Sequence, residues 1–119
     1  MSEHTEQVAL INWCKIMECS HPQLGLIFSI PNGGNRHIVT ARKLRAEGMK
    51  SGVPDLFLPI PRNGKHGLFI EMKFGKNKAS ENQQKWLMSL DAENYQTSVC
   101  YGFDEGRETI IKYLGLETE

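Results

Sequence analysis

The apolar positions of the chain follow two patterns, one typical of helices and one typical of short buried strands. Between residues 3 and 19 apolar side chains recur every three to four positions, which predicts an amphipathic helix. Leu56 to Ile60 and Leu68 to Met72 are short and almost wholly apolar, which predicts two buried strands. The segment 61–66 between them contains Pro and Asn-Gly, so we expect a hairpin loop there.

The remaining segments complete the expected order of elements. The apolar run 24–30 predicts another buried strand. The glycine-rich segment 31–35 after it predicts a tight turn, either a plain connection or a place where a phosphate approaches the backbone. Ser80-Glu81-Asn82-Gln83 matches a capping box, so a helix should begin with Ser80 as its N-cap. Further elements are expected as follows: helices at 37–47 and 104–114, and a strand at 96–101.

This order predicts the α/β class, with a small mixed central β-sheet flanked by helices. The 119 residues, 39% of them hydrophobic, suit a single domain that spans 1–119. No apolar run approaches the ~20 residues of a membrane span, and the N-terminus lacks a signal-peptide pattern, so no membrane association is expected. Three cysteines without a Cys-x-x-Cys pair favour a reducing compartment. We therefore expect a cytoplasmic protein, in the host cytoplasm if the gene is viral.

Charge is distributed unevenly, although the formal net charge is zero. Most of the fourteen Lys and Arg residues lie between residues 36 and 85, a window with only four acidic residues. This arrangement predicts one positive face that suits nucleic acid, with ordinary solvated charge as the alternative. No Lys-Ser or Lys-Thr pair directly follows the glycine-rich segment, so a nucleotide cofactor is not expected. The candidate phosphate contacts are Arg36, Arg42, Lys43, Arg45, Lys76 and Lys78.

Three ionisable residues lie at the ends of the two central predicted strands. Asp55 precedes the first strand, and Glu71 and Lys73 end the second. Side chains alternate between the faces of a strand, so Glu71 and Lys73 share one face, where an apolar setting imposes a desolvation cost. With Asp55 they would form a hard-oxygen site for Mg²⁺ or Mn²⁺ with a cation beside it. A surface ion pair on an edge strand is the alternative.

Two further residues are open to both a structural and a functional interpretation. Glu6 lies four residues before Leu10 on the inward stripe of the first helix. It either complements the helix dipole or adds a carboxylate to the metal site, and Glu3 competes for that second role. Gln83 lies on the inward face of the third helix, where it either only caps the helix or leans into the site.

These motifs resemble the VRR-NUC family of the PD-(D/E)xK nuclease superfamily. The similarity covers essentially the whole chain, as in a minimal stand-alone member, and Glu6-Gln7 is its weakest part. It implies a restriction-endonuclease-like core and a metal-dependent DNA endonuclease. The motifs that carry it are Gly52-Val53-Pro54-Asp55-Leu56, Phe69-Ile70-Glu71-Met72-Lys73 and Ser80-Glu81-Asn82-Gln83-Gln84-Lys85-Trp86-Leu87.

The resemblance also implies a role for each site residue. Lys73 would orient or activate the attacking water and stabilise charge on the phosphoryl group, and Gln83 would help to position the ensemble. The ligands of Mg²⁺ or Mn²⁺ would be the side chains of Glu6, Asp55 and Glu71 and the backbone carbonyl of Met72.

The chain resembles the small stand-alone members of this family, which are homodimers that act on branched DNA such as four-way (Holliday) junctions. The resemblance therefore implies a homodimer whose substrate is branched or duplex DNA. A restriction-type nuclease is a weaker alternative, because the chain is short for an added recognition domain. A nucleic-acid-binding module that has lost catalysis is another, and the intact Asp55, Glu71 and Lys73 argue against it. RNA stays open as a substrate, because no feature reads a 2′-hydroxyl.

Overall fold

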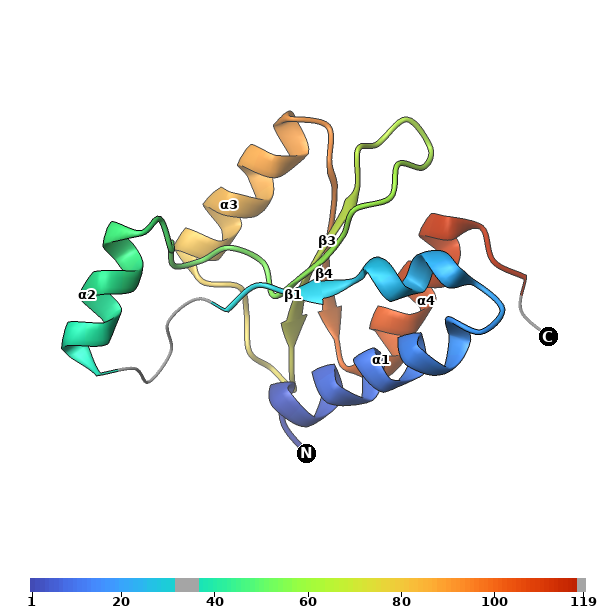
Figure 1. The fold of residues 1–119 in the computed structure, drawn as a ribbon, viewed down its shortest axis with the longest axis horizontal. Helices are drawn as coiled ribbons and strands as arrows, with labels where there is room; N and C mark the ends of the chain where they lie inside the picture. The colour runs from blue at the N-terminus through green and yellow to red at the C-terminus, as the bar shows by residue number, and fades with distance from the viewer. Residues whose placement is uncertain (32–36, 118–119) are drawn as a thin grey trace.

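The computed structural model describes residues 1–31 and 37–117 and contains a four-stranded mixed sheet between helices (Figure 1). The strand order is β1-β2-β3-β4, where β1 and β2 and then β2 and β3 pair antiparallel, and β3 and β4 pair in parallel. The predicted α/β class with a small mixed sheet is confirmed. The strands are β1 (Phe28–Ser29), β2 (Leu56–Leu58), β3 (Leu68–Lys73) and β4 (Gln96–Tyr101).

Two helical layers cover the two faces of the sheet (Figure 1). Helices α1 (Glu3–Met17) and α4 (Phe103–Leu114) lie on one face, and α3 (Glu81–Ala92) lies on the other. Because β3 is central and covered on both faces, all six of its residues are buried. A strand buried on both faces loses the usual alternation of apolar and polar residues, which explains the apolar run at its start, residues 68–70.

The main hydrophobic core lies between the sheet and the α1–α4 layer. Alternate residues of β2 and β3 point into it, and Leu10 of α1 and Ile110 of α4 meet them with no exposed surface. Gly106 of α4 leaves room for Leu10, because a Cβ atom there would lie 2.7 Å from Leu10 Cδ2. The strand residues of this core are Leu56, Leu58, Leu68, Ile70, Met72 and Cys100.

Two local signals produce the connections that flank β3. The hairpin between β2 and β3 turns at Asn63 and Gly64, whose φ angles of 55° and 76° are those of a tight hairpin turn. The parallel pairing of β3 and β4 requires a crossover, which α3 supplies. The predicted capping box begins this helix: the Gln83 N–H donates to Ser80 Oγ at 3.1 Å, and the Ser80 N–H donates to Gln83 Oε1 at 2.8 Å.

The structure differs from the prediction mainly in the run 24–30. Pro22–Leu26 forms a 3₁₀ helix, η1, and only Phe28–Ser29 pairs with β2, so the predicted strand is wrong for its first half. Leu24 is nevertheless buried, because the helical turn directs it into the core. A short apolar run does not by itself distinguish a buried strand from a buried turn of helix. The expected turn at 31–35 lies, apart from Pro31, outside the described residues.

Helix α2 (Ile38–Ala46) confirms the helix predicted at 37–47 and stands apart from the sheet (Figure 1). It has no buried residue and lies at one end of the long axis of the molecule. Among the residues that the structure describes, none of the helices combines the length and apolar character of a membrane span.

We expect Leu10→Ala to lower the free energy of unfolding by about 2–5 kcal/mol, because it removes buried methyl groups and leaves a cavity beside Gly106. Urea unfolding followed by circular dichroism measures this change. Val8→Ala is the matched control, because Val8 lies on the same helix and is 43% exposed. Equal losses for the two variants would contradict the assigned orientation of α1.

Candidate active site

The strands β2 and β3 bring Asp55, Glu71 and Lys73 together on the sheet face that α3 covers. Leu56 pairs with Ile70, so Asp55 lies beside Glu71 at the end of the paired region. Asp55 Oδ2 accepts a hydrogen bond of 2.7 Å from the Met72 N–H. Lys73 Nζ lies 3.2 Å from Glu71 Oε2. The three predicted site residues therefore form one cluster.

Burial sets the electrostatics of this cluster. Glu71 is 1% exposed and Lys73 is 6% exposed, so the alternative of a surface ion pair is wrong. Desolvation, followed by the charge of Asp55, raises the pKa of Glu71 from its ordinary 4.5 to about 7, although Lys73 opposes the shift. Desolvation also raises the pKa of Asp55, and the Met72 N–H and the Lys73 charge oppose that rise.

The oxygen atoms of the cluster suit a hard divalent cation. Glu71 Oε1 is buried and has no hydrogen-bond partner among residues 1–31 and 37–117, which is costly for a carboxylate unless a ligand satisfies it. The N–H and C=O of one strand residue point to the same side, so the carbonyl of Met72 faces Asp55 as its N–H does. Two carboxylates and a carbonyl are the oxygen donors that Mg²⁺ and Mn²⁺ prefer. The residues present therefore fit such an ion.

Glu6 has a different partner from the one that the resemblance implies. Its Oε1 accepts a hydrogen bond of 2.9 Å from the Phe103 N–H at the first turn of α4, where a carboxylate complements the helix dipole. No group of three His, Cys, Asp or Glu side chains within residues 1–31 and 37–117 is arranged to hold a metal ion. Glu6 is thus not gathered with Asp55 and Glu71, and its role as a metal ligand stays a prediction.

Glu3 is the carboxylate of α1 whose charge reaches the cluster. It contributes to the raised pKa of Asp55, after desolvation. Its Oε2 accepts a hydrogen bond of 3.3 Å from Asn77 Nδ2 in the loop that follows β3. This contact joins the beginning of α1 to the loop that leaves the candidate site.

Gln83 serves as a cap in this structure, because its Oε1 accepts the Ser80 N–H. Its neighbour Asn82 has a role that the sequence interpretation missed. Asn82 Nδ2 donates to the Ser51 carbonyl at 2.9 Å and holds the loop that leads to Asp55. Gly52, with φ of 87°, permits this approach, because a Cβ atom there would lie 2.5 Å from Asn82 Nδ2. The signal in the sequence is Gly52, two residues before Pro54 in the motif Gly52-Val53-Pro54-Asp55.

The candidate phosphate contacts lie on two exposed segments. Arg42, Lys43 and Arg45 are exposed on α2. Lys76 and Lys78 are exposed in the loop directly after Lys73. Arg36 lies outside the described residues.

Comparison with known proteins identifies the family of the chain. Residues 3–104 match the model of the VRR-NUC domain. The chain belongs to the VRR-NUC family. A solved structure described as a VRR_NUC domain protein is 30% identical and superposes with a TM-score of 0.83, over 98% of this chain and 91% of that one. No curated protein matches the chain. The VRR-NUC fold is of nuclease type, so the cluster of Asp55, Glu71 and Lys73 lies in a nuclease domain.

For the metal-free VRR-NUC domain we expect the free energy of unfolding to fall as the pH rises from about 4.5 to about 7. Unfolded Glu71 loses its proton near 4.5 while folded Glu71 keeps it until about 7, so the folded state binds more protons across this window. The fall should be roughly 1–3 kcal/mol and should level off above it.

Urea unfolding in EDTA at a series of pH values measures this dependence. Glu71→Gln should lose most of it, whereas Glu108→Gln, a matched change at an exposed position of α4, should keep it. A wild-type curve that is flat between pH 5 and 7.5 would contradict the raised pKa of Glu71.

Proposed function

We propose that this VRR-NUC protein is a Mg²⁺- or Mn²⁺-dependent DNA endonuclease that favours branched DNA and acts as a homodimer. The observation that carries the proposal is the buried cluster of Asp55, Glu71 and Lys73, in which one oxygen of Glu71 has no hydrogen-bond partner in the described part of the chain. Side chains with this burial cost stability, because each buried ion carries a desolvation penalty of several kcal/mol. A structural role does not require such a group, whereas metal binding and catalysis do.

The reaction is hydrolysis of a phosphodiester. The oxygen of a water molecule forms a bond to phosphorus, and the bond from phosphorus to the leaving sugar oxygen breaks. A bound Mg²⁺ or Mn²⁺ supplies Lewis-acid chemistry, because it lowers the pKa of water and neutralises charge that develops on the phosphoryl oxygens. Asp55, Glu71 and the carbonyl of Met72 would hold this ion, and Glu6 or Glu3 would add a carboxylate from α1.

Lys73 contributes a fixed positive charge to this reaction. Its ammonium group is buried and held 3.2 Å from Glu71 Oε2, so it meets the developing charge without first being ordered. It donates hydrogen bonds to the attacking water and to a phosphoryl oxygen. The Met72 N–H holds Asp55 in place, and the cap formed by Gln83 fixes the beginning of α3 beside the loop 74–79.

The charge distribution supports DNA as the substrate. Basic side chains lie on the loop that leaves Lys73 and on α2, which projects from the body of the protein (Figure 1). Such contacts to phosphates supply affinity without reading sequence. The structural preference and the homodimer rest on the resemblance described above, and a symmetric pair of sites suits a symmetric junction.

A gel cleavage assay tests the function directly. It compares a four-way junction, a flap, a linear duplex and a single strand, each in Mg²⁺, Mn²⁺ or EDTA. Metal-dependent cleavage that favours the junction would support the proposal. Tight binding without cleavage of any substrate would overturn it in favour of an inactive binding module.

Lys73→Ala should lower the rate of junction cleavage at least about 100-fold, because it removes charge that stabilises the transition state. It should still bind Mn²⁺, as measured by isothermal titration calorimetry. Asp55→Asn is the contrasting variant, and it should lose both cleavage and most of the heat of Mn²⁺ binding. Undiminished cleavage by Lys73→Ala, or unchanged Mn²⁺ affinity of Asp55→Asn, would refute the assigned role of that residue.

The pair Arg42→Gln and Arg45→Gln should weaken DNA binding and reduce its salt dependence. Loss of two phosphate contacts should lower the slope of log K against log salt by about 2. Fluorescence anisotropy in EDTA measures this slope. The salt concentration is varied from about 50 to about 200 mM, a range over which the release of counterions from DNA changes the affinity strongly. Lys112→Gln is the control, because Lys112 is exposed on α4, which lies on the sheet face opposite α3. Equal slopes for wild type and the double variant would place the DNA elsewhere.

A further inference from the structure

A continuous row of aromatic rings crosses the sheet on the side of the candidate site. Phe28 of β1 contacts Phe57 of β2 edge-to-face, with ring centroids 5.8 Å apart. Phe57 stacks on Phe69 of β3 at 4.2 Å, and Tyr95 meets Phe69 at 5.3 Å. Gly67 leaves room for the row, because a Cβ atom there would lie 2.8 Å from Phe57 Cε1. The row begins at the edge strand and ends under α3.

The strand register places this row directly beside the acidic cluster. Phe57 lies two residues after Asp55 on β2, and Phe69 lies two residues before Glu71 on β3, so all four side chains share one face. Phe28 lies opposite Phe57 on the neighbouring strand. From the usual spacings within a sheet, the backbone positions of Phe28 and Asp55 are roughly 8 Å apart. That is about two to three base steps of stacked DNA.

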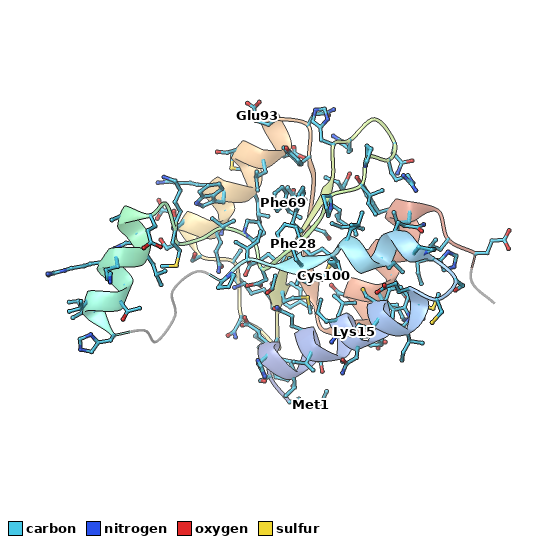
Figure 2. The ribbon with its side chains drawn as sticks, viewed as in Figure 1. Met1, Lys15, Phe28, Phe69, Glu93 and Cys100 are labelled. Carbon is cyan, nitrogen blue, oxygen red and sulfur yellow. The ribbon has the colours of Figure 1, made fainter. Side chains whose placement is uncertain are left out.

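The two ends of the aromatic row differ in solvent exposure. Phe69 is 9% exposed, whereas Phe28 is 49% exposed. In the view of Figure 2 both labelled rings lie near the middle of the molecule, between α3 and α1. Helix α3 packs against β4, away from β1, so it leaves the outer end of the row open. The ring of Phe28 is therefore supported by Phe57 and open to solvent at the edge of the sheet, where it lines a hollow with α1 residues that include His4, Asn12 and Lys15.

We propose that Phe28 is a stacking platform for an unpaired base, or for the end base pair of a DNA branch, while the scissile phosphate lies at Asp55 and Glu71. This inference rests on the proposed nuclease function. Every base has an aromatic face, so stacking on a protein ring tolerates any sequence. Neighbouring base pairs cover these faces within a continuous duplex and expose them at a branch. A ring at this position thus selects the shape of the DNA and not its sequence.

The surroundings favour nucleic acid over an apolar protein partner. The exposed basic residues of α2 and of the loop 74–79 attract phosphate. The ring is also rigidly supported, because it leans on Phe57, which in turn stacks on the buried Phe69. Preorganised rings lose little freedom when a base stacks on them. A second copy of this chain is the competing occupant, and the experiment below separates it from DNA.

The test measures binding in EDTA, so it does not depend on cleavage. A four-way junction carries 2-aminopurine next to the branch, and stacking on a ring changes its fluorescence. Anisotropy gives the affinities for this junction and for a linear duplex of equal length. The variants are Phe28→Ala, Phe28→Leu, which keeps an apolar side chain without an aromatic face, and Phe28→Trp, which keeps that face. Ile16→Ala is the control, because Ile16 is 71% exposed on α1 and does not line the hollow that contains Phe28.

We expect Phe28→Ala and Phe28→Leu to bind the junction roughly 5- to 150-fold more weakly, to bind the duplex unchanged, and to lose the fluorescence change. Phe28→Trp and Ile16→Ala should behave as the wild type does. Equal weakening for junction and duplex, or wild-type behaviour of Phe28→Leu, would overturn the proposal. So would a wild-type protein that does not distinguish the two DNAs.

Light scattering after size-exclusion chromatography separates the competing occupant. A change of mass confined to the Phe28 variants would assign the ring to an interface between two copies and overturn the proposal. Failure of the nuclease function is a different result. If the wild-type protein cleaves no substrate but binds the junction, and Phe28→Leu loses that binding, then the stacking platform is supported and the catalytic function is refuted.

Discussion

The structure depends on the burial of two opposite charges on a central strand. Glu71 and Lys73 alternate with apolar residues on β3, whose two faces are both covered. Burial of a charged carboxylate costs several kcal/mol of stability unless hydrogen bonds or opposite charges compensate it, so the groups around Glu71 must be held in place. Lys73 pairs with one oxygen of Glu71, and no described residue gives the other oxygen a hydrogen bond. The fold thus holds a buried carboxylate oxygen that a cation can bind.

The two faces of the sheet divide stability from chemistry. On the α1–α4 side, Leu10 and Ile110 complete an apolar core that contains no ionisable carboxylate. On the α3 side, the acidic cluster and the aromatic row share one surface. Because side chains of β3 alternate between these faces, the same strand serves both purposes. Changes on the first face should therefore act mainly on stability, and changes on the second mainly on binding and catalysis.

The segments around the site are tied to it by a few specific contacts. Asn82 of α3 holds the loop before Asp55, and Asn77 joins the loop after Lys73 to Glu3. Helix α2 has no such anchor among the described residues; it stands apart from the sheet, and its basic side chains are exposed (Figure 1). This contrast suits two different roles. The anchored residues set the geometry of the site, and under the proposed function the exposed basic residues of α2 contact DNA.

The sequence by itself determined the features that depend on neighbouring residues. Asn63-Gly64 specified the hairpin, and Ser80 with Gln83 specified the start of α3, because turns and caps are made by residues a few positions apart. The apolar blocks defined β2 and β3, and the motifs around Asp55 and Glu71 indicated the family.

Only the tertiary structure decided the contacts between distant segments. Glu6 bonds the N–H of Phe103, 97 positions away, while Glu3 affects Asp55, and spacing within one helix could not separate these two roles. Leu24 entered the core from a 3₁₀ turn, since an apolar run specifies burial but not backbone conformation. The exposure of Phe28 also depends on tertiary structure, because α3 packs against β4 and leaves the edge strand β1 uncovered.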